Sequence, residues 1–264
     1  MSVKVKRLAG AYACALLAAL TAGCLLSDSN YTAYTHTDES TLYWSASGLT
    51  KLVAITQNGN VAVNGVAGDA ITSKVARTST GTSLDDARSH INDVVITEST
   101  AGGTLTLKAT VPSVSDRDYS ASYDMNIRKW LVTELTTASG SISVDSMAGN
   151  TTLLTSNGNV TVTSHTGTVI ANCASGSVTC SVDSLANTDS ISVSVTNGGV
   201  TVSVPATLSA VFHATTVNGT ATVSGFSSIT YTTNTTTSKS GTIGSGGPII
   251  RASATNGNVV IKTQ

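Results

Sequence analysis

Small or apolar residues alternate with polar ones on both sides of a recurring glycine. Positions three and five before this glycine, and two and four after it, are the small or apolar ones, as Leu153, Thr155, Val160 and Val162 are around Gly158. Alternate residues of a β-strand share one face, so each copy predicts a half-buried strand on either side of the glycine. Each glycine follows Asn or Ser, and Asn-Gly favours a tight turn because both residues tolerate positive φ. The seven turn glycines are Gly59, Gly140, Gly158, Gly176, Gly198, Gly219 and Gly257.

The spacing of these glycines indicates stacked repeats. Successive intervals are 81, 18, 18, 22, 21 and 38 residues, and the last is close to two units of 19. One fold with this period is a β-solenoid, in which Leu153 stacks on Ala171 and Val160 on Val178. The other is a meander in which each Asn-Gly forms the loop of an antiparallel hairpin. Further glycines 18 residues apart, Gly149 and Gly167, favour the solenoid.

Residues 65–130 interrupt the repeats and read as an elaborated N-terminal α+β cap. Ser83 with Asp86 resembles a capping box that opens a short helix through Ala87, His90 and Ile91. Strands are expected at 94–96, 105–107 and 119–127, with a turn at 101–103. We therefore expect one all-β solenoid domain over residues 46–264, with residues 131–264 as the main array.

The amino terminus is typical of an export signal. Residues 1–23 run from a basic stretch through an apolar segment to small residues, and that segment is too short to span a bilayer. Residues 20–24, Leu-Thr-Ala-Gly-Cys, resemble a bacterial lipobox apart from Thr21, so Cys24 is the expected lipidation site. Residues 24–45 would then be a tether to the membrane, and Leu25 after the cysteine resembles an outer-membrane destination.

Composition narrows the function classes. Only 11% of residues are charged, the formal net charge is −1 and the chain contains 23 glycines but 3 prolines. Nucleic-acid sites are strongly basic, so a nucleic-acid partner is set aside. From residue 147 onward the only acids are Asp183 and Asp189, which is too few for the converging carboxylates of a glycosidase. We predict no catalytic residues, cofactor or metal site, and hold a carbohydrate-active enzyme as the weakest alternative.

Two groups of side chains leave alternatives open. Cys173 and Cys180 flank Gly176 and are both predicted to point inward, either as a disulfide or as two buried thiols. The aromatic residues gather before the repeats, where they form either a sugar-binding patch or a cover over the end of the solenoid. These aromatic residues are Tyr31, Tyr34, Trp44, Tyr119, Tyr123 and Trp130.

The repeats resemble a bacterial family known as putative adhesins, a β-strand-repeat domain of unknown function common on lipoproteins. The resemblance covers roughly residues 50–264, and it is carried by residues 58–61, 157–160, 202–205 with 217–219, and 244–247 with 256–259. One departure is Arg128-Lys129-Trp130, where an apolar-Pro step is expected before the array. The resemblance implies a right-handed β-helix-like body in the cell envelope and an adhesive role, with no catalytic residues.

The expected function is a non-enzymatic, lipid-anchored envelope protein. Its Ser/Thr/Asn face would meet an envelope or extracellular protein or glycan. A periplasmic scaffold that self-associates through strand edges is the alternative.

Overall fold

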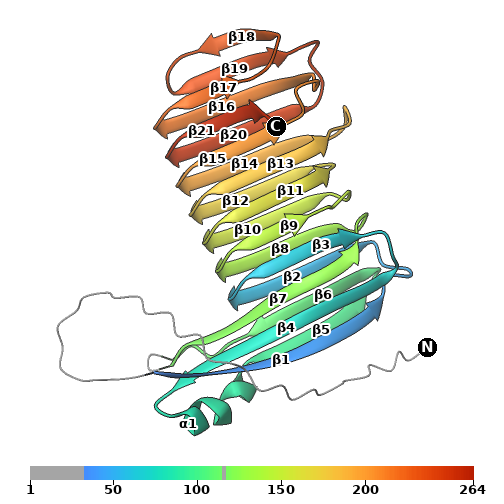
Figure 1. Cartoon of the computed structure of the whole chain (residues 1–264), viewed down its shortest axis with the longest axis vertical. Helices are drawn as coiled ribbons and strands as arrows, with labels where there is room; N and C mark the ends of the chain where they lie inside the picture. Colours follow the sequence, from blue (N-terminus) through green and yellow to red (C-terminus); the bar gives the residue numbers. More distant parts are fainter. Residues whose placement is uncertain (1–32, 115–116) are drawn as a thin grey trace, which may run out of the picture.

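The computed structural model describes residues 33–114 and 117–264. The chain is mostly β, and its strands form two large, mostly parallel sheets that face each other in a β-solenoid-like stack (Figure 1). The signal segment, Cys24 and Tyr31 lie outside the described residues.

Sheet A has ten strands in the order β1-β4-β7-β3-β9-β11-β13-β15-β21-β17. Their bounds are β1 Tyr34–Ser45, β3 Val61–Val66, β4 Ala70–Gly81, β7 Tyr119–Arg128, β9 Ile142–Asp145, β11 Val160–Thr166, β13 Val178–Ser184, β15 Val200–Val204, β17 Ala221–Ser224 and β21 Val259–Thr263.

Sheet B has eleven strands in the order β18-β19-β16-β20-β14-β12-β10-β8-β2-β6-β5. Their bounds are β2 Lys51–Asn58, β5 Val95–Ala101, β6 Thr104–Thr110, β8 Val132–Ser139, β10 Thr151–Asn157, β12 Val169–Ser175, β14 Ser190–Asn197, β16 Ala210–Asn218, β18 Ile229–Asn234, β19 Ser238–Ile243 and β20 Ile249–Asn256. Two short helical segments, α1 Leu84–Ser89 and η1 Ile91–Asp93, follow β4.

Each turn glycine joins a strand of sheet B to a strand of sheet A, and we call such a pair of strands a rung. Strands of successive rungs pair in parallel, with Leu153 opposite Ala171 and Val160 opposite Val178. Both predicted stacking pairs are therefore confirmed. The hairpin meander is wrong, because the two strands beside each glycine belong to different sheets.

The glycine corners stack on one another, and this contact explains the recurring residue. A Cβ on Gly158 would lie 2.1 Å from the carbonyl oxygen of Gly140, and a Cβ on Gly140 would lie 2.0 Å from that of Gly59. Gly158 also has φ of +142°, which a residue with a Cβ rarely adopts. No larger residue fits this column without moving its neighbours.

The preceding Asn or Ser plays a different part from the one expected. It ends the sheet B strand, and among the described non-glycine residues only Ser146 and Ser164 have positive φ. The corner is therefore a bend between two sheets and not the tight hairpin turn that Asn-Gly suggested. Asn side chains after the corner instead bond the next rung, as when Asn159 Oδ1 accepts from the amide of Ser177 at 2.9 Å.

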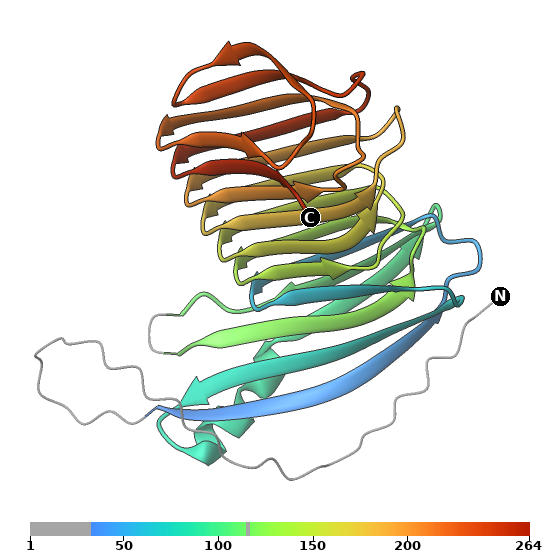
Figure 2. The ribbon, with the colours of Figure 1, turned by 45° about the horizontal axis from the view of Figure 1, so that its top comes forward.

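The spatial order of the rungs departs from the order along the chain. Rung β20–β21 lies between β14–β15 and β16–β17, although it follows both of them in sequence. The 38-residue interval is therefore not two equivalent units. It holds the antiparallel strands β18 and β19, which cover the C-terminal end of the stack (Figure 2).

The other end is closed by the elements expected as a cap. Ser83 accepts a hydrogen bond from the amide of Asp86 at the start of α1, which confirms the predicted helix start. Strands β4 and β7 extend sheet A, whereas β5 and β6 extend sheet B. The cap thus continues the two sheets.

One part of the expected tether is ordered β-structure. Strand β1 pairs antiparallel with β4 along its whole length, from Tyr34 opposite Gly81 to Ser45 opposite Ala70. Leu42 and Trp44 face inward and pack against the core, which is the apolar burial that a free tether would lack. The tether prediction is thus wrong for residues 34–45.

Candidate functional site

The outward face of sheet A in the array carries a column of hydroxyl side chains. The paired strands place Ser143, Thr161, Thr179 and Thr201 side by side in register, and Thr222 lies beyond Val260 in the same column. Neighbouring strands are about 4.8 Å apart, so hydroxyls repeat at that spacing along the stack. This surface offers many neutral hydrogen-bonding groups to a partner.

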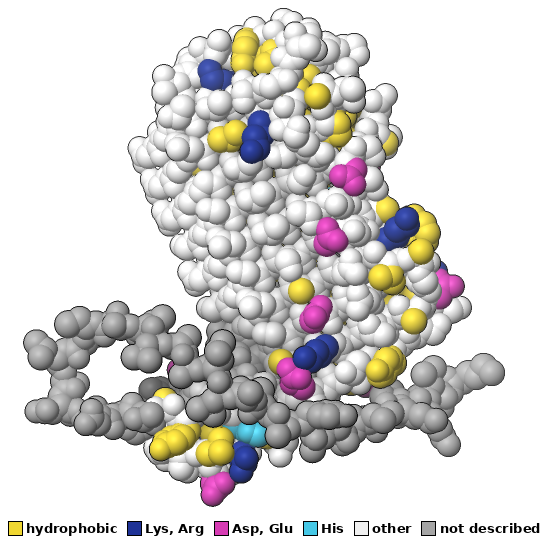
Figure 3. All heavy atoms as spheres, in the orientation of Figure 1, with side chains coloured by type: hydrophobic (Ala, Val, Ile, Leu, Met, Phe, Trp, Pro, Cys, Tyr) yellow, Lys and Arg dark blue, Asp and Glu magenta, His cyan; other side chains and the backbone are white. Residues whose placement is uncertain are grey.

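Charge is concentrated at the cap end of the molecule. In the part of the chain that the structure describes, every ion pair involves residues between 38 and 134. On the face drawn in Figure 3 the stack is mostly white, with a few charged side chains along it. Contacts with the array would therefore depend on hydrogen bonds and shape more than on ion pairing.

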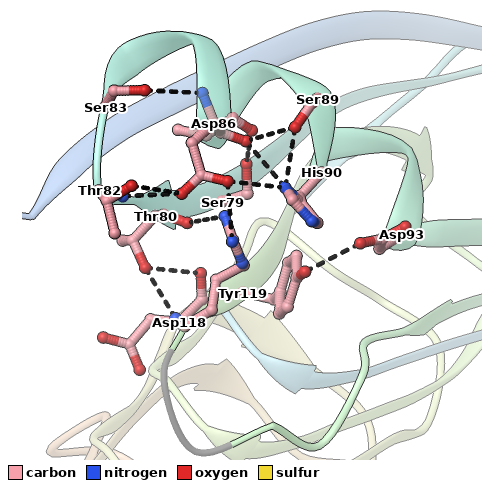
Figure 4. A network of polar contacts seen from close by, with 12 residues as sticks. Ser79, Thr80, Thr82, Ser83, Asp86, Ser89, His90, Asp93, Asp118 and Tyr119 are labelled. Atoms are coloured by element: carbon pink, nitrogen blue, oxygen red, sulfur yellow. Dashed lines mark hydrogen bonds and ion pairs between the residues drawn. The ribbon is translucent and has the colours of Figure 1, made fainter.

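The densest polar cluster surrounds Asp86 in α1 (Figure 4). Its Oδ2 accepts from the amide of Thr82 at 2.8 Å, and its Oδ1 lies 3.0 Å from Nη2 of Arg117. The Thr82 amide, followed by Arg117, lowers the pKa of Asp86 to about 2. The carboxylate stays ionised near neutral pH and anchors α1 to the segment before β7.

Ser89 and His90 lie in the same cluster, yet they do not form a catalytic relay with Asp86. Ser89 Oγ and Asp86 Oδ1 both approach Nδ1 of His90, at 2.9 and 3.2 Å. In a relay, the nucleophile and the acid bond opposite ring nitrogens. Because both groups contact the same ring nitrogen, the cluster stabilises the end of α1 and does not have the geometry of a catalytic relay.

A second histidine is buried inside the array. His165 is fully buried after a bulge in β11, and its Nε2 lies 3.0 Å from the hydroxyl of Thr151. Burial lowers its pKa to about 4, and its Nδ1 has no partner among the described residues. This ring is therefore neutral near pH 7 and fills the interior. His213, by contrast, is exposed between buried Phe212 and Ala214, because alternate residues of a strand face opposite sides.

The two cysteines are free thiols in the structure. Cys173 lies in β12 and Cys180 in β13, and both side chains are buried. The disulfide alternative is not formed. Burial raises the pKa of both thiols, that of Cys180 to about 12, so neither is a ready nucleophile.

The aromatic residues before the array do not make one binding patch. Tyr119 and Tyr123 are buried, and burial raises the pKa of the Tyr123 hydroxyl. Trp44 is half-buried, and its Nε1 donates to Glu98 Oε2 at 3.1 Å. These three rings pack in or against the hydrophobic core between the sheets of the cap and do not form a sugar-binding surface.

The exposed aromatic rings are scattered. Tyr34 lies at the start of β1, whereas Trp130 lies in the turn between β7 and β8 with the Lys129 ammonium 4.8 Å from its ring centre. Residues 128–130, where the family resemblance led us to expect an apolar-Pro step, thus end β7 and form the turn that leads into β8 and the array. Sequence reasoning overlooked Tyr43, which is exposed on β1.

Among the described residues, no group of three His, Cys, Asp or Glu side chains could hold a metal ion. Within the same ranges, no helix has the length and apolar character needed to cross a bilayer.

Comparison with known proteins identifies the fold. A putative cell adhesion protein from Clostridium sporogenes matches 87% of this chain and 100% of its own, with 14% identity and a TM-score of 0.53. At this identity the likeness shows a shared fold. A putative adhesin from Bacteroides fragilis matches 88% of this chain and 97% of its own, with 13% identity and a TM-score of 0.27. No family model and no curated protein matches the chain.

Proposed function

We propose that this chain is a non-enzymatic, lipid-anchored protein of the cell envelope, with an adhesin-like role. The observation that carries the proposal is the outward column from Ser143 to Thr222, a rigid and nearly uncharged surface of hydroxyls on stacked rungs. Such a surface suits a protein or glycan partner in the envelope or outside the cell. The same fold occurs in a solved chain described as a putative cell adhesion protein.

The anchor that we propose would orient the stack. Strand β1 begins ten residues after Cys24, and ten extended residues span at most about 35 Å. The cap end would therefore stay near the membrane, and the end that carries β18 and β19 would project away from it. We propose the outer membrane as the site, on the basis of Leu25.

We also propose that the rungs wind in a right-handed sense. Strands β10 and β12 are parallel neighbours joined through β11 in the opposite sheet. Connections of this kind are right-handed in about 98% of cases, which agrees with the family resemblance.

Protease shaving of intact cells tests the anchored, outward-facing arrangement. The wild-type chain should be cleaved, whereas Cys24→Ala should lose its lipid and its membrane association. A periplasmic protein serves as the control for intact cells. Resistance of the wild type until the outer envelope is opened would contradict an adhesive role.

Strand β1 favours the alternative of a self-associating periplasmic scaffold. It has 12 residues and, within the described ranges, pairs only with β4 at the edge of sheet A. An open edge can pair with a second copy. A sedimentation coefficient that rises with concentration would support the scaffold, and a strictly monomeric chain would remove it.

A further inference from the structure

A groove of about 650 Å³ opens near the C-terminal end of the stack, on the side away from the glycine corners. It lies among three loops, which join β13 to β14, β15 to β16, and β19 to β20. Its polar lining includes Asp183, Ser184, Asn187, Thr207, Ser209 and Ser245. The volume falls within the range of roughly 300–1,000 Å³ that is usual for small-ligand sites.

The groove follows from the inserted rung. In the regular part of the stack, the loop after a strand of sheet A leads to the neighbouring strand of the next rung in sheet B. The loop after β15 differs, because it bypasses β20, the neighbour of β14, and leads to β16. The loop into β20 arrives from β19 instead. Three loops of different origin therefore meet at one place. A Cβ on Gly247 would lie 2.9 Å from the Ser209 carbonyl oxygen and 3.2 Å from Asn187 Oδ1.

Hydrogen bonds of the backbone hold each loop in shape. The amide of Ala186 donates to Asp189 Oδ2 at 2.8 Å, and that of Leu208 donates to the Pro205 carbonyl at 3.0 Å. The amide of Ser245 reaches Ser209 Oγ at 3.3 Å, which ties two of the loops together. A site built on such loops loses little conformational freedom when a ligand binds.

Several lining side chains remain available for a ligand. Asp183, Asn187 and Thr207 are exposed, and their side chains form no hydrogen bond within the part of the chain that the structure describes. Leu185 and Leu208, both half-buried, add apolar surface between these polar groups. The groove thus alternates hydrogen-bonding groups with apolar ones.

We propose that this groove binds a neutral saccharide, and this proposal rests on the proposed adhesive function. A sugar ring presents hydroxyls at its edge and C–H groups on its faces, which matches the mixed lining. The Asp183 carboxylate can accept from two neighbouring hydroxyls, whereas it would repel an anionic sugar. The lining contains no Lys, Arg or His to attract an acidic ligand. The three loops that line the groove belong to the half of the stack that lies farther from β1 and from the proposed anchor (Figure 1).

Saturation-transfer NMR and calorimetry on the full chain test this proposal. The chain is kept in a detergent without a sugar headgroup and titrated with neutral tri- and tetrasaccharides of glucose, galactose, mannose and N-acetylglucosamine. Sulfated and sialylated counterparts are run in parallel. We expect saturable binding of at least one neutral saccharide with a Kd of about 1 mM or lower, and weaker binding of its anionic form.

A pair of double variants locates the binding. Asn187→Ala with Thr207→Ala should weaken binding by about tenfold or more, since 1.4 kcal/mol corresponds to a factor of ten. Asn172→Ala with Thr188→Ala is the matched control, because both residues are exposed but do not line the groove. The control should bind like the wild type.

Three outcomes would overturn the proposal. These are no saturable binding by any neutral saccharide, preference for the anionic forms, and wild-type affinity in the groove variant. The proposed adhesive function is tested by a different experiment, and it would be contradicted if protease did not cleave the chain on intact cells. A surface-exposed chain whose groove binds no saccharide would leave adhesion to the hydroxyl face of sheet A.

Discussion

The thiol of Cys173 donates a hydrogen bond to the carbonyl oxygen of Gly158 across 3.2 Å. This contact repeats one that threonine makes elsewhere in the stack. Thr137 bonds the Gly59 carbonyl at 2.9 Å, and Thr155 bonds the Gly140 carbonyl at 3.0 Å. Cys173 therefore takes the place of a threonine in a column of buried donors beside the glycine corners.

Replacing Cys173 should reveal what this donor contributes. Cys173→Thr keeps a donor of similar size, whereas Cys173→Val leaves the Gly158 carbonyl without one. A buried acceptor left unpaired costs about 1–3 kcal/mol, so we expect the Thr variant to be more stable than the Val variant by at least about 1 kcal/mol. Urea unfolding measures the difference. Thr155→Val is the parallel test, and equal stability in both pairs would contradict the donor role.

The corner glycines should not accept a side chain. Gly158→Ala would place its Cβ 2.1 Å from the Gly140 carbonyl oxygen at a φ of +142°. We expect a loss of about 3 kcal/mol or more in the free energy of unfolding, or no folded protein. Gly68→Ala is the control, because no atom lies within 4 Å of its Cβ position, and it should change stability by less than about 0.5 kcal/mol. A Gly158→Ala chain that melts like the control would disprove the steric account.

Acid should weaken the fold through His165. Burial lowers its pKa from 6.5 to about 4, while a hydrogen bond with the Gly149 backbone, followed by the charges of Asp189 and Asp183, acts in the opposite direction. Because the unfolded chain binds this proton more tightly, stability is complete above about pH 6.5 and falls as the pH drops toward 4, by up to about 3 kcal/mol.

Stability measured as a function of pH checks this effect. His165→Gln should flatten the curve between pH 6.5 and 4, and His213→Gln, on an exposed residue, should not. If the slope in this range were the same in both variants, a group other than His165 would be responsible.

The thiols should react slowly until the chain unfolds. Cys173 and Cys180 are buried, and burial raises the pKa of both, which lowers the thiolate fraction near pH 8. Alkylation followed by peptide mass spectrometry should label neither residue in the native chain and both in urea. Failure to label them in urea before reduction would show a disulfide instead.

The repeat unit could be predicted from the sequence, because the strand alternation and the corner glycine that define it involve residues close together in the chain. Strand alternation places Leu153 and Val160 inward, and the clash at each corner restricts the column to glycine. The Ser83 helix start was also predictable, since its partner Asp86 lies three residues away. Strand β1 was missed because only Leu42 and Trp44 mark its inner face as apolar, and its partner β4 lies far along the chain.

The candidate site was less predictable. The hydroxyl column followed from the polar positions between inward residues, such as Thr161 and Thr179. The aromatic rings could not be placed, because burial of Tyr119 and exposure of Trp130 depend on how β7 and its turn sit against other strands. The loops around Asn187, Thr207 and Gly247 carry no local pattern that marks them as one groove.

The alternation around each glycine and the spacing of the glycines were enough to favour a stack of repeated strand pairs, because neighbouring residues carry that information. Tertiary structure alone decided the order of those rungs. Strands β14, β16 and β20 present similar small and apolar inner faces, so their local sequences do not say which of them are neighbours. In the folded chain β20 pairs with β14 on one side and with β16 on the other, so it lies between the two. The groove exists because of that order, so it could be found only in the folded chain.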